Sequence, residues 1–206
     1  MTLISHEPQC ANARLLRAAA PPTSPGTDRT LVVFATALAL WSVAYLVPHL
    51  YWALGGTIGL SAVKPSASAL PEWRAINWAA SGVLALPALV AVAVVRARPG
   101  VVKTGLLLIT MAGSAIAAAH GLYGIVYRSV TVAGAIDVDG QSFDASRHGW
   151  VIWDLLVFEP WFLIEGLLLA GVGSIATPPS SRRRWIIACA AAIALATLTG
   201  LLGVRV

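Results

Sequence analysis

The sequence predicts an all-α membrane protein, a bundle of about five transmembrane helices. Hydrophobic residues make up 58% of the 206 residues and charged residues only 11%, whereas a soluble domain carries about 25% charged residues. The apolar residues also gather in uncharged stretches of about twenty residues, the length that crosses a hydrocarbon core of about 30 Å. We therefore expect a multi-pass membrane protein that is embedded in the lipid bilayer.

The N-terminal segment differs from the rest of the chain. Residues 1–29 are polar and rich in proline, and we predict a flexible cytoplasmic tail, with a short amphipathic surface helix over 11–20 as the alternative. A cleaved secretory signal is not expected, because the first apolar run begins near Thr30 and is too long for one. Residues 30–206 are then the transmembrane bundle.

Each apolar stretch has local signals that fit a spanning helix. The first ends at the Gly55-Gly56 pair, a natural stop. The second contains Pro87, which neighbouring helices can accommodate. The third is rich in small residues, which let helix backbones approach closely, so we expect it at the bundle centre. The predicted spans are about 30–51, 75–95, 103–127, 149–175 and 185–204.

Basic residues give the predicted orientation, with the N-terminus in the cytoplasm and the C-terminus outside. The segments assigned to the cytoplasm hold nine Lys and Arg residues and the outer segments five, as the positive-inside tendency requires. The charge of +5 is thus divided among short clusters between spans, so a nucleic-acid partner is not expected. Cys10 and Cys189 lie towards the cytoplasmic side, which does not favour a disulfide.

The two outer connections are the longest. We expect residues 53–74 to form an ordered loop or a short interfacial helix. In 128–148, strand-like composition at 130–132 and 135–138 flanks the turn dipeptide Asp139-Gly140, which predicts a small extracytoplasmic β-hairpin. The fragment around Asp137 resembles the start of a calcium loop but lacks its other ligands, so no calcium site is expected.

Ionisable residues within the predicted spans mark the candidate site. Such residues are costly in a membrane and usually face a cavity or the bundle interior. At about 1.5 Å per residue, His49, His120 and Asp154 fall in one layer near the outer side of the membrane. Glu159 lies nearer the midplane, and Glu165 lies deeper.

Helical periodicity adds aromatic residues to this layer. In a regular helix the side chain of Glu159 would point away from these aromatic residues. Pro160 removes a backbone hydrogen-bond donor, and we expect the resulting kink to turn Glu159 towards them. Three helices would then share one polar-aromatic space. The three faces are Trp41, Tyr45, His49 and Trp52; His120, Tyr123 and Tyr127; and Asp154, Phe158, Trp161 and Glu165.

Several interpretations of this cluster stay open. One interpretation is that its members form polar contacts that hold the helices together, and another is that they line a pocket for a small ligand or lipid headgroup. The alternatives are axial ligation of haem by two histidines, a divalent metal site, a quinone site, and a proton path. A proton-coupled transporter is a further alternative, although no internal repeat is found.

A non-enzymatic role is the leading interpretation. No familiar catalytic motif is present, so the sequence leaves open whether the chain is an enzyme, and any cofactor is unknown. We expect an outward-facing polar pocket for a small ligand or lipid, or a subunit of a membrane assembly formed with a protein partner or further copies of the chain. The candidate ligand-binding residues are His49, Tyr51, Trp52, His120, Tyr123, Asp154, Glu159 and Trp161.

Two motifs carry a resemblance to a known family. The first is His49-x-Tyr51-Trp52-Ala53-Leu54-Gly55-Gly56-x-x-Gly59, and the second combines Trp153-Asp154-Leu155-Leu156 with Glu159-Pro160-Trp161-Phe162.

Over roughly residues 35–175 the chain resembles a group of small bacterial integral membrane proteins, domain of unknown function 3995. Its members are usually shorter and four-spanning, so the N-terminal tail and fifth span look like additions. The resemblance implies a bacterial cytoplasmic membrane and no particular reaction. The positions that it points to are His49, Tyr51, Trp52, Asp154, Glu159 and Trp161.

Overall fold

The structure, a computed structural model, describes residues 25–203 and contains no β-strand in that range. Five of the described helices are long and apolar enough to cross a membrane, which confirms the predicted fold class. The predicted tail falls largely on residues 1–24, which lie outside the described residues, as does Cys10. Cys189 is free and buried.

The long helices follow the apolar stretches, and short helices fill the connections. The segment 149–176 is one continuous helix that a single π-helical turn divides in two. The elements are α2 (Pro25–Ala53), η1 (Leu60–Ala62), α3 (Pro65–Ser68), α4 (Trp73–Arg96), α5 (Val101–Val132), α6 (Gly149–Trp153), the π-helical turn η2 (Asp154–Phe158), α7 (Glu159–Ala176) and α8 (Pro179–Leu201).

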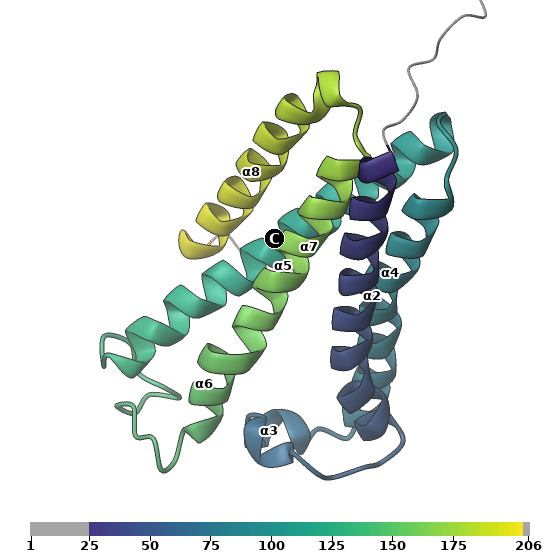
Figure 1. The fold of residues 1–206 in the computed structure, drawn as a ribbon. Helices are drawn as coiled ribbons and strands as arrows, with labels where there is room; N and C mark the ends of the chain where they lie inside the picture. The colour runs from purple at the N-terminus through teal and green to yellow at the C-terminus, as the bar shows by residue number, and fades with distance from the viewer. Residues whose placement is uncertain (1–24, 204–206) are drawn as a thin grey trace, which may run out of the picture.

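The helices form two pairs that diverge like the arms of a V (Figure 1). Helix α2 packs along α4, and α5 packs along α7, while α8 covers the far side of α5. We call the end where the pairs meet the basic end, because Arg96, Lys103 and Arg182–Arg184 belong to the helix ends there. The opposite end, with the connections 54–72 and 133–148, is the loop end.

The main apolar core explains why the arms meet at the basic end. Leu38 of α2, Val94 of α4 and Val172 of α7 are fully buried there, and close van der Waals packing of this kind holds membrane helices together. Towards the loop end no equivalent apolar layer joins the two pairs within residues 25–203. The seven buried members of this core are Leu31, Ala35, Leu38, Ala91, Val94, Leu169 and Val172.

Glycines let α5 and α7 approach closely. A Cβ atom at Gly121 would overlap the backbone of Glu159 and Leu163, and one at Gly166 would overlap Ala118. Small residues at such contacts are how membrane helices pack in the absence of a hydrophobic driving force. Helix α5 contacts α4, α7 and α8, whereas α7 contacts all four of the other long helices, so α7 has the more central place.

The predicted β-hairpin is wrong except for its turn. Residues 130–132 continue α5, and Thr131 donates a side-chain hydrogen bond to the carbonyl of Tyr127. Helical continuity thus overrides their β-branched composition. Beyond the helix, one isolated bridge joins Val138 to Gln141 across a turn in which Asp139 and Gly140 have φ values of 52° and 76°.

Candidate functional site

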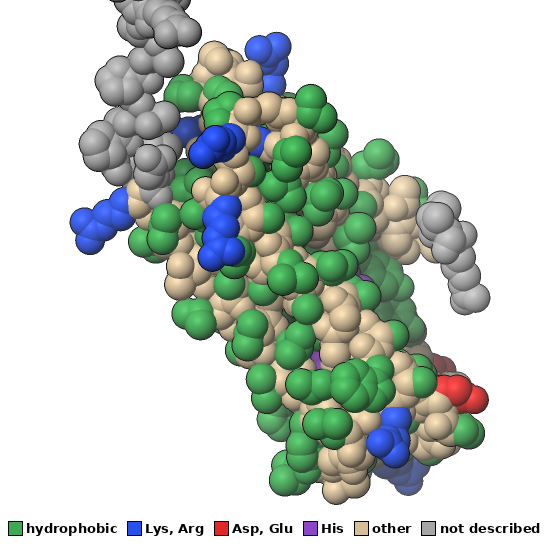
Figure 2. Space-filling model, turned by 90° about the vertical axis from the view of Figure 1, so that its right-hand side faces the viewer, with side chains coloured by type: hydrophobic (Ala, Val, Ile, Leu, Met, Phe, Trp, Pro, Cys, Tyr) green, Lys and Arg blue, Asp and Glu red, His purple; other side chains and the backbone are tan. Residues whose placement is uncertain are grey.

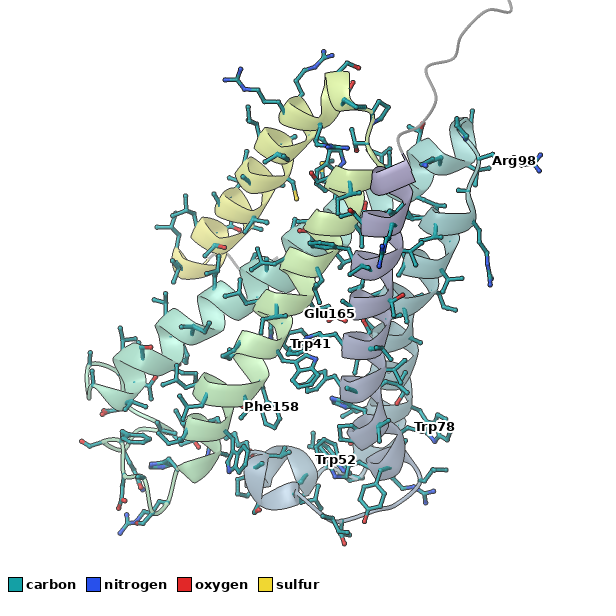
Figure 3. All side chains as sticks on the ribbon, viewed as in Figure 1. Trp41, Trp52, Trp78, Arg98, Phe158 and Glu165 are labelled. Carbon is teal, nitrogen blue, oxygen red and sulfur yellow. The ribbon has the colours of Figure 1, made fainter. Side chains whose placement is uncertain are left out.

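A cavity of about 370 Å³ lies at the loop end, between the two arms of the V. Figure 3 shows Trp52 and Phe158 at this end of the molecule, one from α2 and the other from η2. Four aromatic rings provide most of the apolar wall. The lining residues are Tyr45, His49, Trp52, Val63, Lys64, Arg128, Trp150, Asp154 and Phe158.

Local helix geometry decides which side chains of η2 reach the cavity. Pro160 has no N–H to donate to the preceding turn, and the N–H of Glu159 instead bonds the carbonyl of Asp154, five residues earlier. Asp154 and Phe158 line the cavity, whereas Glu159 is buried against α5, beside Gly124. The expected kink is present, but it does not bring Glu159 into the cavity.

His49 is held by a buried asparagine. Its Nδ1 lies 2.9 Å from Oδ1 of Asn77, whose Nδ2 donates to the carbonyl of Trp73 at 2.8 Å. Because that carbonyl can only accept, the amide nitrogen must face Trp73 and the amide oxygen must face His49. Nδ1 therefore carries a proton, and in the neutral imidazole Nε2 is an acceptor that bonds none of the described residues.

Two cations border the same cavity around the ring of Trp150. Arg128 lies 5.0 Å from the ring centroid and pairs with Asp154 at 2.8 Å. Lys64 lies 5.4 Å from the same centroid and pairs with Asp139 at 2.7 Å. The Nε of Arg128 is buried without a hydrogen-bond partner within residues 25–203, while the residue itself lines the cavity.

The first sequence motif closes the end of α2. Trp52 is buried and donates to the carbonyl of Ile58 at 2.9 Å. The Tyr51 hydroxyl accepts the backbone N–H groups of Thr57 and Ile58, and its ring occupies the space that a Cβ at Gly56 would need. Tyr51 therefore shapes the connection from outside the cavity, while Trp52 belongs to the cavity wall.

Besides Tyr51 and Glu159, three further predicted site residues lie away from this cavity. His120 approaches the Glu159 carboxylate at 3.6 Å and lines a second cavity between α4 and α5. Tyr123 stacks on Tyr127 and faces Gly200 of α8.

Trp161 lies where α2 meets α7, deeper than the cavity. Its ring stacks on Trp41, with 4.0 Å between ring centroids, and on Tyr45, with 5.3 Å. The carbonyl of Trp161 accepts the Nε1–H of Trp41 at 3.1 Å, and its own Nε1 is buried without a partner among the described residues. Figure 3 shows Trp41 and Glu165 close together on this seam.

Sequence reasoning missed several residues that shape the site. Arg128 and Lys64 were used only to predict the orientation in the membrane. Trp150 was treated as one of several aromatic residues near the ends of the spans. Asn77 could have been found from the sequence, because a polar amide side chain within an apolar predicted span indicates a position that faces the protein interior.

The structure separates the two histidines that redox or metal chemistry would combine. His49 and His120 line different cavities, an arrangement that does not favour one haem iron between them. In the part of the chain described, no group of three or more His, Cys, Asp or Glu side chains is placed to hold a metal ion.

One acidic group outside the spans is tuned by its neighbours. The hydroxyl and the backbone N–H of Ser146 donate to Asp144 at 2.7 and 2.8 Å. These hydrogen bonds lower the pKa of the Asp144 carboxyl from its usual value of 3.8, with a smaller contribution from Arg147. The bonded turn orders the connection just before α6.

Comparison with known proteins gives one match. Residues 42–169 match the model of a family described as "Protein of unknown function (DUF3995)". No curated protein and no solved structure matches the chain. The matched range contains every residue that lines the cavity and stops before α8.

Proposed function

Since this chain belongs to the family of proteins of unknown function DUF3995, we propose its function from its own geometry. It is an integral membrane protein, and we propose that its loop-end cavity binds a small organic ligand or a lipid headgroup. The observation that carries the proposal is an aromatic-walled cavity of about 370 Å³ with unused polar groups. Ligand pockets are mostly apolar, with a few placed polar groups, and begin at about 300 Å³.

The cavity is proposed to face outwards. Figure 2 shows Lys and Arg side chains gathered at the upper end of the molecule, which corresponds to the basic end. Arg98, labelled in Figure 3, lies at this same end. Positive residues are retained on the cytoplasmic side, and this supports an orientation in which the loop end lies outside. A water-soluble ligand would then reach the cavity without crossing the bilayer.

The wall chemistry restricts the ligand. Nε2 of His49 accepts a hydrogen bond, so it selects a hydroxyl or amine on the ligand. The guanidinium of Arg128, which lines the cavity, can only donate hydrogen bonds, so it selects a carbonyl, carboxylate or phosphate oxygen. The rings of Tyr45, Trp52, Trp150 and Phe158 favour a flat or apolar body between these two ends. A whole phospholipid is too large for this volume.

The test is direct identification of a bound molecule. The protein is purified in mild detergent, and its ligands are identified by native mass spectrometry and solvent extraction. Rebinding of the identified molecule is then followed by tryptophan fluorescence. His49→Ala and Trp150→Ala should each weaken binding about tenfold or more, a change of about 1.4 kcal/mol. Trp78→Ala is the matched control, because Trp78 is half exposed on α4 and does not line the cavity.

The same sample separates the rival functions. A visible spectrum and metal analysis are recorded before extraction. A Soret band or a stoichiometric metal that is lost in His49→Ala would replace the ligand-binding proposal by haem or metal chemistry. Equal binding by the wild-type protein and both cavity variants would also overturn it.

A further inference from the structure

A second cavity, of about 450 Å³, opens between α4 and α5 above a floor formed by α7. Its walls are apolar except for His120 and Glu165. Glu165 is buried and lies 2.7 Å from the Ser42 hydroxyl through one carboxyl oxygen, whereas the His120 side chain is exposed. The lining residues are Val83, Leu84, Leu86, Pro87, Val90, Ile109, Ala112, Gly113, Ile116, Ala117, His120, Phe162, Glu165 and Leu169.

The depth of His120 makes its exposure unusual. It lies about 28 Å from the start of α5 and about 18 Å from its end, at about 1.5 Å per residue. A hydrocarbon core of about 30 Å centred on this helix therefore contains the imidazole. Because Val83, Ile109 and Ile116 at its rim are exposed apolar residues, the cavity opens towards the lipid, and its occupant must be soluble in the lipid core.

The imidazole also lacks a hydrogen-bond partner. Its side chain is 56% exposed, and its Nε2 lies 3.6 Å from Oε2 of Glu159, within ion-pair distance of the carboxylate but longer than a hydrogen bond. No hydrogen bond joins it to any other residue within 25–203. The ring of Phe162 packs against it edge to face at 4.6 Å and holds its orientation. A polar group that faces hydrocarbon without a partner is unfavourable.

We propose that this cavity binds a lipid-soluble quinone, with a ring carbonyl that accepts a hydrogen bond from His120. The neutral ring can remain at this depth, whereas a charged phospholipid headgroup cannot. The apolar tail would lie along the groove between α4 and α5, where Ala112 and Ala117 leave room. This site is separate from the loop-end cavity and does not depend on the function proposed for it.

Binding is tested in phosphatidylcholine nanodiscs with a decyl-substituted benzoquinone as the probe. Isothermal titration should give one saturable site above the partitioning measured in empty nanodiscs. His120→Ala should raise Kd about tenfold or more, and His120→Gln, which keeps a donor, should recover part of the affinity. Ala112→Phe should block the groove. Leu108→Phe is the control, because Leu108 is an exposed residue of α5 outside the cavity.

Four results would overturn the proposal. The first is no saturable binding by the wild-type protein, and the second is equal binding by folded Ala112→Phe. A site that Trp150→Ala removes and His120→Ala leaves intact would lie in the other cavity. A dimer detected by mass photometry and lost in Ala112→Phe would assign the groove to a second copy of the chain. Thermal unfolding and gel filtration establish that each variant is folded.

Discussion

The hydroxyl of Ser42 lies 2.7 Å from the carboxyl group of Glu165, and both side chains are buried where α2 meets α7. The same hydroxyl lies 2.9 Å from the carbonyl of Leu38. It has one proton for these two acceptors. The contact is the polar continuation of the apolar core that joins the arms of the V.

This pair predicts an asymmetric mutational result. Ser42→Ala leaves a buried carboxyl group unpartnered and should cost about 1–3 kcal/mol of stability, because the desolvation penalty is then uncompensated. Ser42→Ala combined with Glu165→Leu should be less destabilised than Ser42→Ala alone. Thermal unfolding in detergent measures both. A double variant as unstable as the sum of its single variants would contradict this account.

Close packing of α5 on α7 predicts a steric effect at one glycine. A Cβ at Gly121 would overlap the α7 backbone, so Gly121→Ala should destabilise the protein by about 1–3 kcal/mol. Gly105→Ala is the matched control on the same helix, because a Cβ there meets nothing within 4 Å. That control should be neutral or slightly stabilising. Equal unfolding temperatures for the two variants would argue against the packing.

The ion pair between Lys64 and Asp139 links the two loop-end connections, 75 residues apart in sequence. Both side chains are exposed, so a double-mutant cycle with Lys64→Met and Asp139→Asn should give a coupling of about 0.2–1 kcal/mol. Asn keeps the positive φ at position 139 without strain. The coupling should shrink at high salt. A coupling independent of salt would mean that packing, not charge, joins the loops.

The turn at Asp144 predicts a local response to acid. Its pKa is lowered in the folded chain by the hydrogen bonds from Ser146. The turn therefore has its full stability above the usual pKa of 3.8 and loses it as the pH falls through the lowered value. The amide resonance of Ser146 should report this titration in an NMR experiment. Asp144→Asn should abolish the titration, and an unchanged titration would assign it to another group.

The level of a residue along its helix was predictable from the sequence, and rotation about each helix axis was not. Counting residues placed His49 and Asp154 at one level, and both line the loop-end cavity. His120 has a similar depth, yet α5 turns it towards α4 and a different cavity. The apolar residues around His120 give no strong periodic signal, because lipid-facing and protein-facing positions of a membrane helix are both apolar.

Side-chain partners were also beyond sequence reasoning. Asn77 meets His49 only because α2 and α4 run side by side, and Arg128 meets Asp154 only because α5 packs on the segment 149–176. The β-branched residues at 130–132 illustrate the converse, since local composition pointed to a strand and an established helix continued through them.

The π-helical turn at 154–158 is a single-residue insertion in a continuous helix. One residue corresponds to about 100° of rotation in a helix with 3.6 residues per turn. Deleting a residue of this turn that does not line the cavity, such as the exposed Leu156, would rotate the whole segment 149–153 relative to α5. Trp150 would then turn away from Arg128 and Lys64, and the cavity would lose the ring that these two cations border.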